Sequence, residues 1–362
     1  MGQSITNHAT KKGYLEALRI IGIYLVIFNH TGKEGFFLFS IRQQSSFYWI
    51  YMFLSILCKI AVPIFWMISG SLLLTKEETI SEVLKKRELR FLIVLILFSF
   101  IQYLYGIYIK EYSWSFFVFI KALVTTNMAA AYWYLYSFAA LILMIPFLRK
   151  TAINMSNNEY IYLITLNIIF LGILPIIWFL YDKGNSSIEE NFSPLIATSG
   201  YIVYPLVGYF IEHRVKQQYY NRKISCLLLI SSIICIGISC IMTQYHANIK
   251  GILEEHTSQT FYNLLLLIPS ITMFYLVKYF FTHIPIPEWI NKLIILIGST
   301  TFGIMLLENI IREQTLIYFF NIRHALHIPY MLACLIWVMC IFFIGMLITI
   351  VLKKIPLLKK LI

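Results

Sequence analysis

The sequence predicts an all-α integral membrane protein with about ten transmembrane helices and both termini in the cytoplasm. Three observations predict this fold. Of the 362 residues, 59% are hydrophobic and only 13% are charged, whereas soluble domains have about 25% charged residues. Apolar runs long enough to cross the hydrocarbon core recur along the chain. Lysine and arginine gather in alternate connecting segments, as the positive-inside rule requires.

Ten apolar segments follow one another along the chain. We expect spans at 14–31, 47–74, 91–109, 132–148, 160–181, 194–211, 224–243, 260–281, 293–312 and 329–352. The second span is long, and we expect Pro63 to kink it because proline has no N–H for the helix. Residues 113–125 are apolar but too short to span, so we expect an interfacial or re-entrant segment on the outer side.

These spans and short loops use nearly the whole length. We expect one transmembrane domain over residues 1–362, with a polar tail at 1–13, a basic tail at 353–362 and no appended soluble domain. No signal-peptide cleavage site follows the first apolar run, which is therefore expected to be a retained span. The net charge of +12 is then explained by the excess of lysine and arginine in cytoplasmic loops, which face anionic lipid headgroups. Nucleic acid is therefore not an expected partner.

The first span carries Arg19 and His30 near its opposite ends. The separation corresponds to about 16 Å of helix, half the thickness of the hydrocarbon core. Charged groups inside a membrane are costly, so they point to function. His30 is either an interfacial histidine bonded to a neighbour or a general base, because imidazole titrates near neutral pH. Glu16 lies three residues before Arg19, a spacing that allows an ion pair, which can be purely structural.

Arg87 and Arg90 open the third span at its predicted cytoplasmic end. Arginines three residues apart share one helix face and can present two planar guanidinium groups to a polyphosphate. The alternative is ordinary positive-inside charge, for which Lys85 and Lys86 are the comparison. Position alone leaves both interpretations open.

Further residues of interest lie in apolar runs. Ser69 and Gly70 end the second span and, as small residues, permit close helix packing. Lys59 is an ammonium within the same span, and it needs a carboxylate partner or a hydrated cavity. Glu308 lies in the ninth span at a predicted depth similar to that of His30. We expect Glu308 either to orient His30 or to neutralise Lys59.

The six cysteines lie within apolar runs and show no CxxC or Cys/His ligand spacing. Small hydrophobic side chains are the simpler interpretation, so neither a disulfide framework nor a metal site is predicted. We expect no permanently bound cofactor.

Several short motifs occur in a fixed order along nearly the whole chain. Arg19 and His30 match a pattern of Arg or Lys, ten residues, then His, and Arg87 and Arg90 match Arg-x-x-Arg. The other matching segments are Pro63–Gly70, Trp133–Leu135, Pro146–Arg149 and Tyr204–Tyr209. Together they resemble the membrane-bound acyltransferase type 3 family, which modifies surface polysaccharides, O-antigens, peptidoglycan and small sugars.

The resemblance implies an O-acyltransferase in a bacterial cytoplasmic membrane. Its co-substrate would be an acyl-CoA, in the first place acetyl-CoA, and its acceptor a saccharide or lipid-linked glycan. Arg87 and Arg90, helped by Arg19, would hold the phosphates of CoA at the inner face. His30 would deprotonate a sugar hydroxyl or relay the acyl group.

One departure from the family pattern lies in the ninth span. The family often has Tyr-x-x-His there, whereas this chain has Met305 and Glu308. How the site is completed near this span therefore stays open.

Two other function classes fit a polytopic membrane protein. A transporter of glycans would use the 17% aromatic residues for sugar stacking, but it should show internal repeats with broken spans, which we do not find. A glycan polymerase favours a large outer loop that bears its catalytic residues, whereas the longest outer stretch, 110–131, is mostly apolar. The acceptor sugar, the acyl group and the oligomeric state are not predicted.

Overall fold

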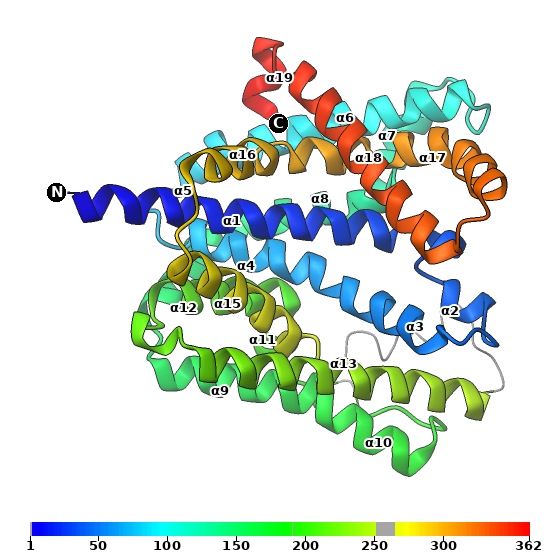
Figure 1. The fold of residues 1–362 in the computed structure, drawn as a ribbon. Helices are drawn as coiled ribbons and strands as arrows, with labels where there is room; N and C mark the ends of the chain where they lie inside the picture. Colours follow the sequence, from blue (N-terminus) through cyan, green and yellow to red (C-terminus); the bar gives the residue numbers. More distant parts are fainter. Residues whose placement is uncertain (1, 190, 251–264) are drawn as a thin grey trace. The chain divides into compact units, whose positions relative to one another are not determined.

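The computed structural model describes residues 2–189, 191–250 and 265–362, and its regular structure in these ranges is entirely helical. The all-α prediction is therefore confirmed. The helices, which Figure 1 draws in sequence colours, group into two compact units. Unit 1 comprises Met1–Thr75 and Leu148–Gly298, and unit 2 comprises Lys76–Phe147 and Ser299–Ile362.

Unit 1 is built around the first helix, α1 (Gly2–Asn29), which packs against α4, α15 and α16. Its other elements are η1 (Gly32–Glu34), α2 (Leu38–Ile41), α3 (Tyr48–Leu57), η2 (Cys58–Ile60), α4 (Ala61–Leu73), α9 (Asn157–Ile168), η5 (Ile169–Ile173), α10 (Leu174–Asp182), α11 (Leu195–Thr198), α12 (Gly200–His213), η6 (Gln217–Tyr219), α13 (Arg222–Lys250), α15 (Leu267–His283) and α16 (Glu288–Gly298). In α1, the residues Leu18, Ile23 and Ile27 are fully buried.

Unit 2 contains a long helix, α17 (Thr301–Leu326), that packs against α18 (Tyr330–Leu352) and α6 (Leu89–Tyr108). Its other elements are α5 (Ile80–Glu82), η3 (Val83–Glu88), α7 (Phe116–Thr125), η4 (Ala130–Tyr132) and α19 (Pro356–Leu361). Helix α8 (Trp133–Asn154) begins in unit 2 and ends in unit 1. Part of the predicted basic tail at 353–362 is thus the short helix α19.

Among the residues that the structure describes, six helical segments are long and apolar enough to cross a membrane. They are Tyr48–Leu73, Ile80–Tyr108, Ala130–Asn154, Asn157–Asp182, Arg222–Ile249 and Tyr330–Leu352. Helices α16 and α17 provide a seventh if they are counted as one span. These segments make the chain a multi-pass membrane protein. Each overlaps a predicted span, although Ile80–Tyr108 begins well before the predicted 91–109, and Ala130–Asn154 and Arg222–Ile249 end later than the predicted 132–148 and 224–243.

The remaining predicted spans correspond to shorter or differently bounded helices. The segment 14–31 corresponds to α1 except for its last two residues, and because α1 begins at Gly2 it also includes most of the predicted polar tail. The segment 194–211 is divided between α11 and the 14-residue α12. The segment 260–281 corresponds to α15, although its first residues, 260–264, lie outside the described residues, as does Met1. The count of ten and the cytoplasmic position of both termini stay predictions.

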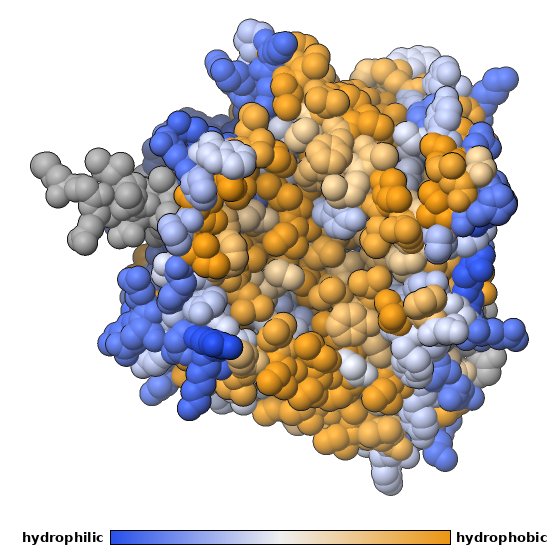
Figure 2. Space-filling model, in the orientation of Figure 1, coloured by the Kyte–Doolittle hydropathy of each residue, from blue (hydrophilic) through white to orange (hydrophobic). Residues whose placement is uncertain are grey.

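Apolar side chains cover the outer surfaces of α9, α10 and α13. Hydrophobic residues predominate in the lower part of Figure 2, where these helices lie. On the same helices, Tyr162, Leu180, Leu227 and Ile241 have exposed fractions of 51–64%. A soluble protein rarely exposes an apolar surface of this extent. Such a surface is typical of contact with lipid.

The long second span changes helix type in its middle. A 3-10 turn, η2, separates α3 from α4 one turn before Pro63. Proline at position 63 has no N–H to donate to the carbonyl of residue 59, and its ring crowds that carbonyl. This places Lys59 within the irregular turn, at the position where we expect the kink.

Helices α4 and α12 approach each other closely through two glycines (Figure 1). A Cβ atom added to Gly70 of α4 would collide with the backbone of Pro205, and one added to Gly208 of α12 would collide with the backbone of Met67. Backbone atoms cannot move aside, so these positions require glycine. The prediction that small residues at the end of span 2 serve close packing is confirmed for Gly70.

The apolar segment 113–125 forms the ten-residue helix α7. Its N-terminus is capped by Ser115, whose Oγ accepts a hydrogen bond from the amide of Val118 at 3.4 Å. Phe117 and Val124 are 84% and 79% exposed. A helix of this length is too short to span, as predicted.

Candidate functional site

His30 lies directly after the last residue of α1. Its backbone amide donates to the carbonyls of Val26 and Ile27 at 3.2 and 3.1 Å, so the last turn of the helix fixes its position. The side chain is half-buried. Its place at the end of a buried helix agrees with both sequence interpretations, an interfacial histidine and a base.

The two neighbours of His30 connect α1 to the second span. The Cys58 thiol donates to the side-chain oxygen of Asn29 at 3.8 Å. On the other side, Thr31 Oγ1 accepts from the amide of Phe36 at 3.0 Å. The ring of Phe36 in turn lies under the ammonium of Lys59, with the nitrogen 4.4 Å from the ring centroid.

Glu16 and Arg19 form an ion pair on α1, which their spacing allows. Their side chains are 15% and 30% exposed. Gly298 of α16 lies so close to Glu16 that any larger residue would collide with it. The charged pair therefore belongs to the packed contact between α1 and α16.

Ser69 makes a local hydrogen bond. Its hydroxyl donates to the carbonyl of Phe65, one turn earlier in α4, at 2.7 Å. A Cβ added to Gly22 of α1 would meet the ring of the same Phe65 at 2.9 Å. This serine thus lies near the contact between α1 and α4 and satisfies its hydroxyl within its own helix.

In unit 2, Arg87 and Arg90 bind different segments. Arg87 donates from Nε and Nη2 to the carboxylate of Glu78, at 2.5 and 2.7 Å. Arg90 donates from Nη2 to the carbonyl of Leu361 in the C-terminal helix, at 3.2 Å. The hydrogen bonds from Arg87 hold the pKa of the Glu78 carboxyl below its ordinary value of 4.5.

The local backbone explains why the two arginines diverge. Arg87 lies in the π-helical turn η3, whereas Arg90 follows in the regular helix α6. The expectation that both share one face rests on the period of 3.6 residues, which a π turn widens. Single π turns occur frequently at functional sites.

Glu308 is fully buried on α17. Its carboxylate lies 3.6 Å from Nε of Arg312, one turn later on the same helix. Arg312 also donates to the side-chain oxygen of Asn309 at 2.6 Å, and the amide of Asn309 donates to Gln102 of α6 at 3.3 Å. Unit 2 therefore contains a buried polar cluster of Gln102, Glu308, Asn309 and Arg312. The predicted roles of Glu308 toward His30 and Lys59, which belong to unit 1, stay predictions.

Sequence reasoning identified Glu308 in this cluster but missed the rest. The spacing of Glu308 and Arg312, four residues apart on a helix, is the signal that identifies this pair in retrospect. Gln102 and Asn309 offer no such local signal, because α6 and α17 are distant in sequence. The cost of polar side chains in a membrane makes the whole cluster a candidate for function.

A second buried network, also missed, lies in unit 1. The Tyr14 hydroxyl of α1 donates to Glu212 of α12, and the same carboxylate oxygen is 3.1 Å from the ammonium of Lys278 on α15. Lys278 also lies over the ring of Tyr220, 4.7 Å from its centroid. Tyr14 precedes Glu16 by less than one helical turn, and the network connects α1 to α12 and α15. We assign it to the packing of unit 1.

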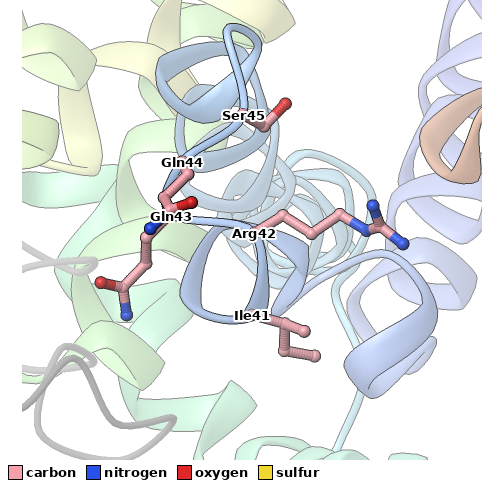
Figure 3. A pocket seen from close by; sticks show the side chains of 5 residues that line it. All are labelled: Ile41, Arg42, Gln43, Gln44 and Ser45. Atoms are coloured by element: carbon pink, nitrogen blue, oxygen red, sulfur yellow. The ribbon is translucent and has the colours of Figure 1, made fainter.

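A polar cavity opens between α2 and α3 (Figure 3). It has a volume of about 620 Å³ and is lined by Ile41, Arg42, Gln43, Gln44 and Ser45. The side chains of Arg42 and Gln43 point in different directions (Figure 3), so they do not converge on one point. Within the described residues, no group of three or more His, Cys, Asp or Glu side chains is arranged to hold a metal ion.

The comparisons with known proteins agree with the motifs. A family model described as an acyltransferase domain matches residues 12–354, nearly the whole chain. No curated protein and no solved structure matches. The matched range includes Glu16, Arg19, His30 and every other candidate residue, in both units. The chain therefore belongs to the membrane-bound acyltransferase type 3 family.

Proposed function

We propose that this protein transfers an acyl group, in the first place acetyl, from cytoplasmic acyl-CoA to a hydroxyl of a surface or lipid-linked saccharide. The observation that carries the proposal is the family match over residues 12–354 of a multi-pass membrane chain. The motif formed by Arg19 on the buried helix α1 and His30 directly after it supports the proposal. The proposed location is a bacterial cytoplasmic membrane.

His30 is the proposed base. It takes the proton of the acceptor hydroxyl as the oxygen attacks the carbonyl carbon of the thioester. A C–O bond forms, the C–S bond breaks, and the CoA thiolate takes the proton back from the imidazolium. A relay in which the imidazole itself carries the acyl group uses the same residue and gives the same products.

Arg19, Arg87 and Arg90 are the proposed donor-binding residues. Guanidinium groups bind phosphate by paired, charge-assisted hydrogen bonds, and CoA offers several phosphate oxygens. Arg87 already holds a carboxylate in this geometry, which supports its suitability for an anion. Binding of a CoA phosphate at Arg87 then requires the hydrogen bonds between Arg87 and Glu78 to break.

The experiment uses sealed inside-out and right-side-out membrane vesicles from cells that express the protein, whose own glycans supply the acceptor. Radiolabelled acetyl-CoA is added outside the vesicles, and label in the carbohydrate fraction is followed. We expect inside-out vesicles to incorporate label, because the donor site faces the cytoplasm, and Arg90→Gln to raise the KM for acetyl-CoA. Arg222→Gln, an arginine at the start of α13 that we assign no role, is the control.

Incorporation from the right-side-out vesicles alone contradicts the proposed donor side. An unchanged KM in Arg90→Gln contradicts the role of that arginine. If neither vesicle type uses acetyl-CoA, succinyl-CoA and propionyl-CoA are tested in the same way. Failure of all three donors contradicts acyl-CoA as the substrate.

A further inference from the structure

Lys59 lies in the middle of the candidate span Tyr48–Leu73, away from both of its ends. Its neighbours Cys58 and Ile60 are 1% and 0% exposed, and the three residues form the 3-10 turn η2. The ammonium lies over the ring of Phe36, 4.4 Å from the centroid. A charge at this depth is costly, and lysines inside membranes generally serve a function.

The contacts around η2 place Lys59 at the His30 end of α1. Cys58, the residue before Lys59, is hydrogen-bonded to Asn29, the residue before His30. Phe36, under the ammonium, is bonded through its amide to Thr31, the residue after His30. Helix α1 and the turn η2 also pack directly against each other. Both neighbours of His30 are thus tied to the surroundings of Lys59.

The backbone explains why a lysine is held there. Pro63 interrupts the regular hydrogen bonding of the second span, which produces the 3-10 turn. This turn replaces regular α-helix between α3 and α4. The turn therefore presents its side chain at a fixed break, within unit 1, rather than along a regular helix face.

We propose that Lys59 is a catalytic residue, whose ammonium stabilises the negative charge on the thioester carbonyl oxygen during acyl transfer. The inference rests on the proposed function. When the acceptor oxygen bonds to the carbonyl carbon, the carbonyl π electrons move to oxygen and His30 takes the hydroxyl proton. The ammonium donates a hydrogen bond to this oxyanion and keeps its own proton. The electrons return as the C–S bond breaks, and His30 protonates the thiolate.

The Phe36 ring is suited to holding an ammonium in this position. A cation over an aromatic face is attracted by the electrons of the ring, and this attraction involves no transfer of a proton. An ammonium carries three N–H groups, so one of them can bond to a transient oxyanion. A preorganised donor of this kind contributes more in a site with little water than in bulk solvent.

The test compares Lys59→Met and Lys59→Arg with the wild type in membranes, at varied concentrations of radiolabelled acetyl-CoA. Methionine keeps the length of the side chain and removes the charge, whereas arginine keeps the charge. We expect Lys59→Met to lower the apparent kcat about 100- to 1000-fold, with the KM for acetyl-CoA changed less than about threefold. The apparent kcat of Lys59→Arg should be at least about tenfold higher than that of Lys59→Met, because a cationic donor remains.

Lys33→Met is the matched control. Lys33 lies three residues after His30 and is exposed, so its removal takes a positive charge from the same region without emptying a buried position. We expect its kcat to stay within about twofold of the wild type. Rates are normalised to the folded fraction, measured by size-exclusion chromatography of the solubilised protein.

Three results overturn the inference. The first is a kcat of Lys59→Met within about threefold of the wild type. The second is an equal loss in Lys33→Met, which indicates only a general effect of charge. The third is a loss in Lys59→Met that arginine does not relieve and that follows the folded fraction, which indicates packing. If the wild type transfers no acyl group from any acyl-CoA, the proposed function fails instead.

Discussion

The carboxylate of Glu78 holds the guanidinium of Arg87 with two hydrogen bonds, of 2.5 and 2.7 Å. Both side chains belong to unit 2 and are 20% exposed, so the ion pair is largely buried. A carboxylate in this bidentate position occupies the hydrogen-bond donors that a phosphate would use. This pair therefore bears directly on the proposed binding of CoA.

Glu78→Gln should lower the KM for acetyl-CoA. The amide binds Arg87 more weakly than the carboxylate does, so the phosphate displaces it at lower cost. A partly exposed ion pair contributes about 0.2–1 kcal/mol, which corresponds to a KM up to about fivefold lower. Initial rates at varied acetyl-CoA concentration measure this change. A higher KM would indicate that Glu78 positions Arg87 for the donor instead of competing with it.

The same pair predicts a pH dependence of stability. Because Arg87 holds the pKa of Glu78 below 4.5, the folded protein keeps the carboxylate charged where the unfolded chain begins to bind a proton. The stabilisation is thus fully present above pH 4.5 and is lost as the pH falls through the lowered pKa. We expect the wild type to melt at a higher temperature than Glu78→Gln at about pH 7, and this difference to shrink at about pH 4. A difference independent of pH contradicts the assignment.

Much of the fold could be predicted from the sequence because a membrane imposes a simple rule on it. Apolar length predicts the spans, and the long helical segments Tyr48–Leu73 and Tyr330–Leu352 begin and end within one residue of the prediction. The break before Pro63 was also predictable, since proline removes a helical hydrogen bond.

Contacts between distant segments could not be predicted in this way. The π turn that holds Arg87 has no sequence signal, and it changes the face on which a helical spacing places this residue. The bond from Arg90 to Leu361 joins residues from opposite ends of unit 2. Hydropathy shows that a segment is buried in the membrane, but it does not show which other segment it meets.

Breaking the buried ion pair of unit 2 should destabilise the protein. Arg312→Met leaves the fully buried carboxylate of Glu308 without the guanidinium beside it. Loss of one partner of a buried pair costs about 3–5 kcal/mol. Adding Glu308→Gln to Arg312→Met should restore part of this loss, because the buried carboxylate charge is then removed. Melting temperatures of the two single variants and the double variant in detergent measure the coupling, and strict additivity contradicts it.

Glu308 also has a predicted catalytic role, which activity rather than stability tests. We expect Glu308→Gln to lower the rate of acyl transfer by at least about tenfold, since general acid–base groups and their partners contribute on this scale. The rate is expressed per folded molecule, so that loss of packing is not counted. Unchanged activity in Glu308→Ala would contradict the proposal that Glu308 orients His30.

The contact between α4 and α12 predicts a sharp difference between glycines. Gly70→Ala and Gly208→Ala should each destabilise unit 1 by about 1–3 kcal/mol, because the new Cβ meets backbone that cannot give way. A Cβ added to Gly237 of α13 would have no neighbouring atom within 4 Å, so Gly237→Ala is the matched control. The helical preference of alanine should stabilise that variant by about 0.5–1 kcal/mol. Equal melting temperatures for the three variants would contradict the close approach.

The most direct measurement of the central claim compares the wild type with His30→Gln in membranes that receive radiolabelled acetyl-CoA. His283→Gln, an exposed histidine at the end of α15, is the control. We expect the wild type and His283→Gln to form labelled carbohydrate from which mild alkali releases acetate, as it does from an O-acetyl ester. His30→Gln should form none above background, although it is folded. Labelled ester formed by His30→Gln at the wild-type rate would contradict the role of His30 in acyl transfer.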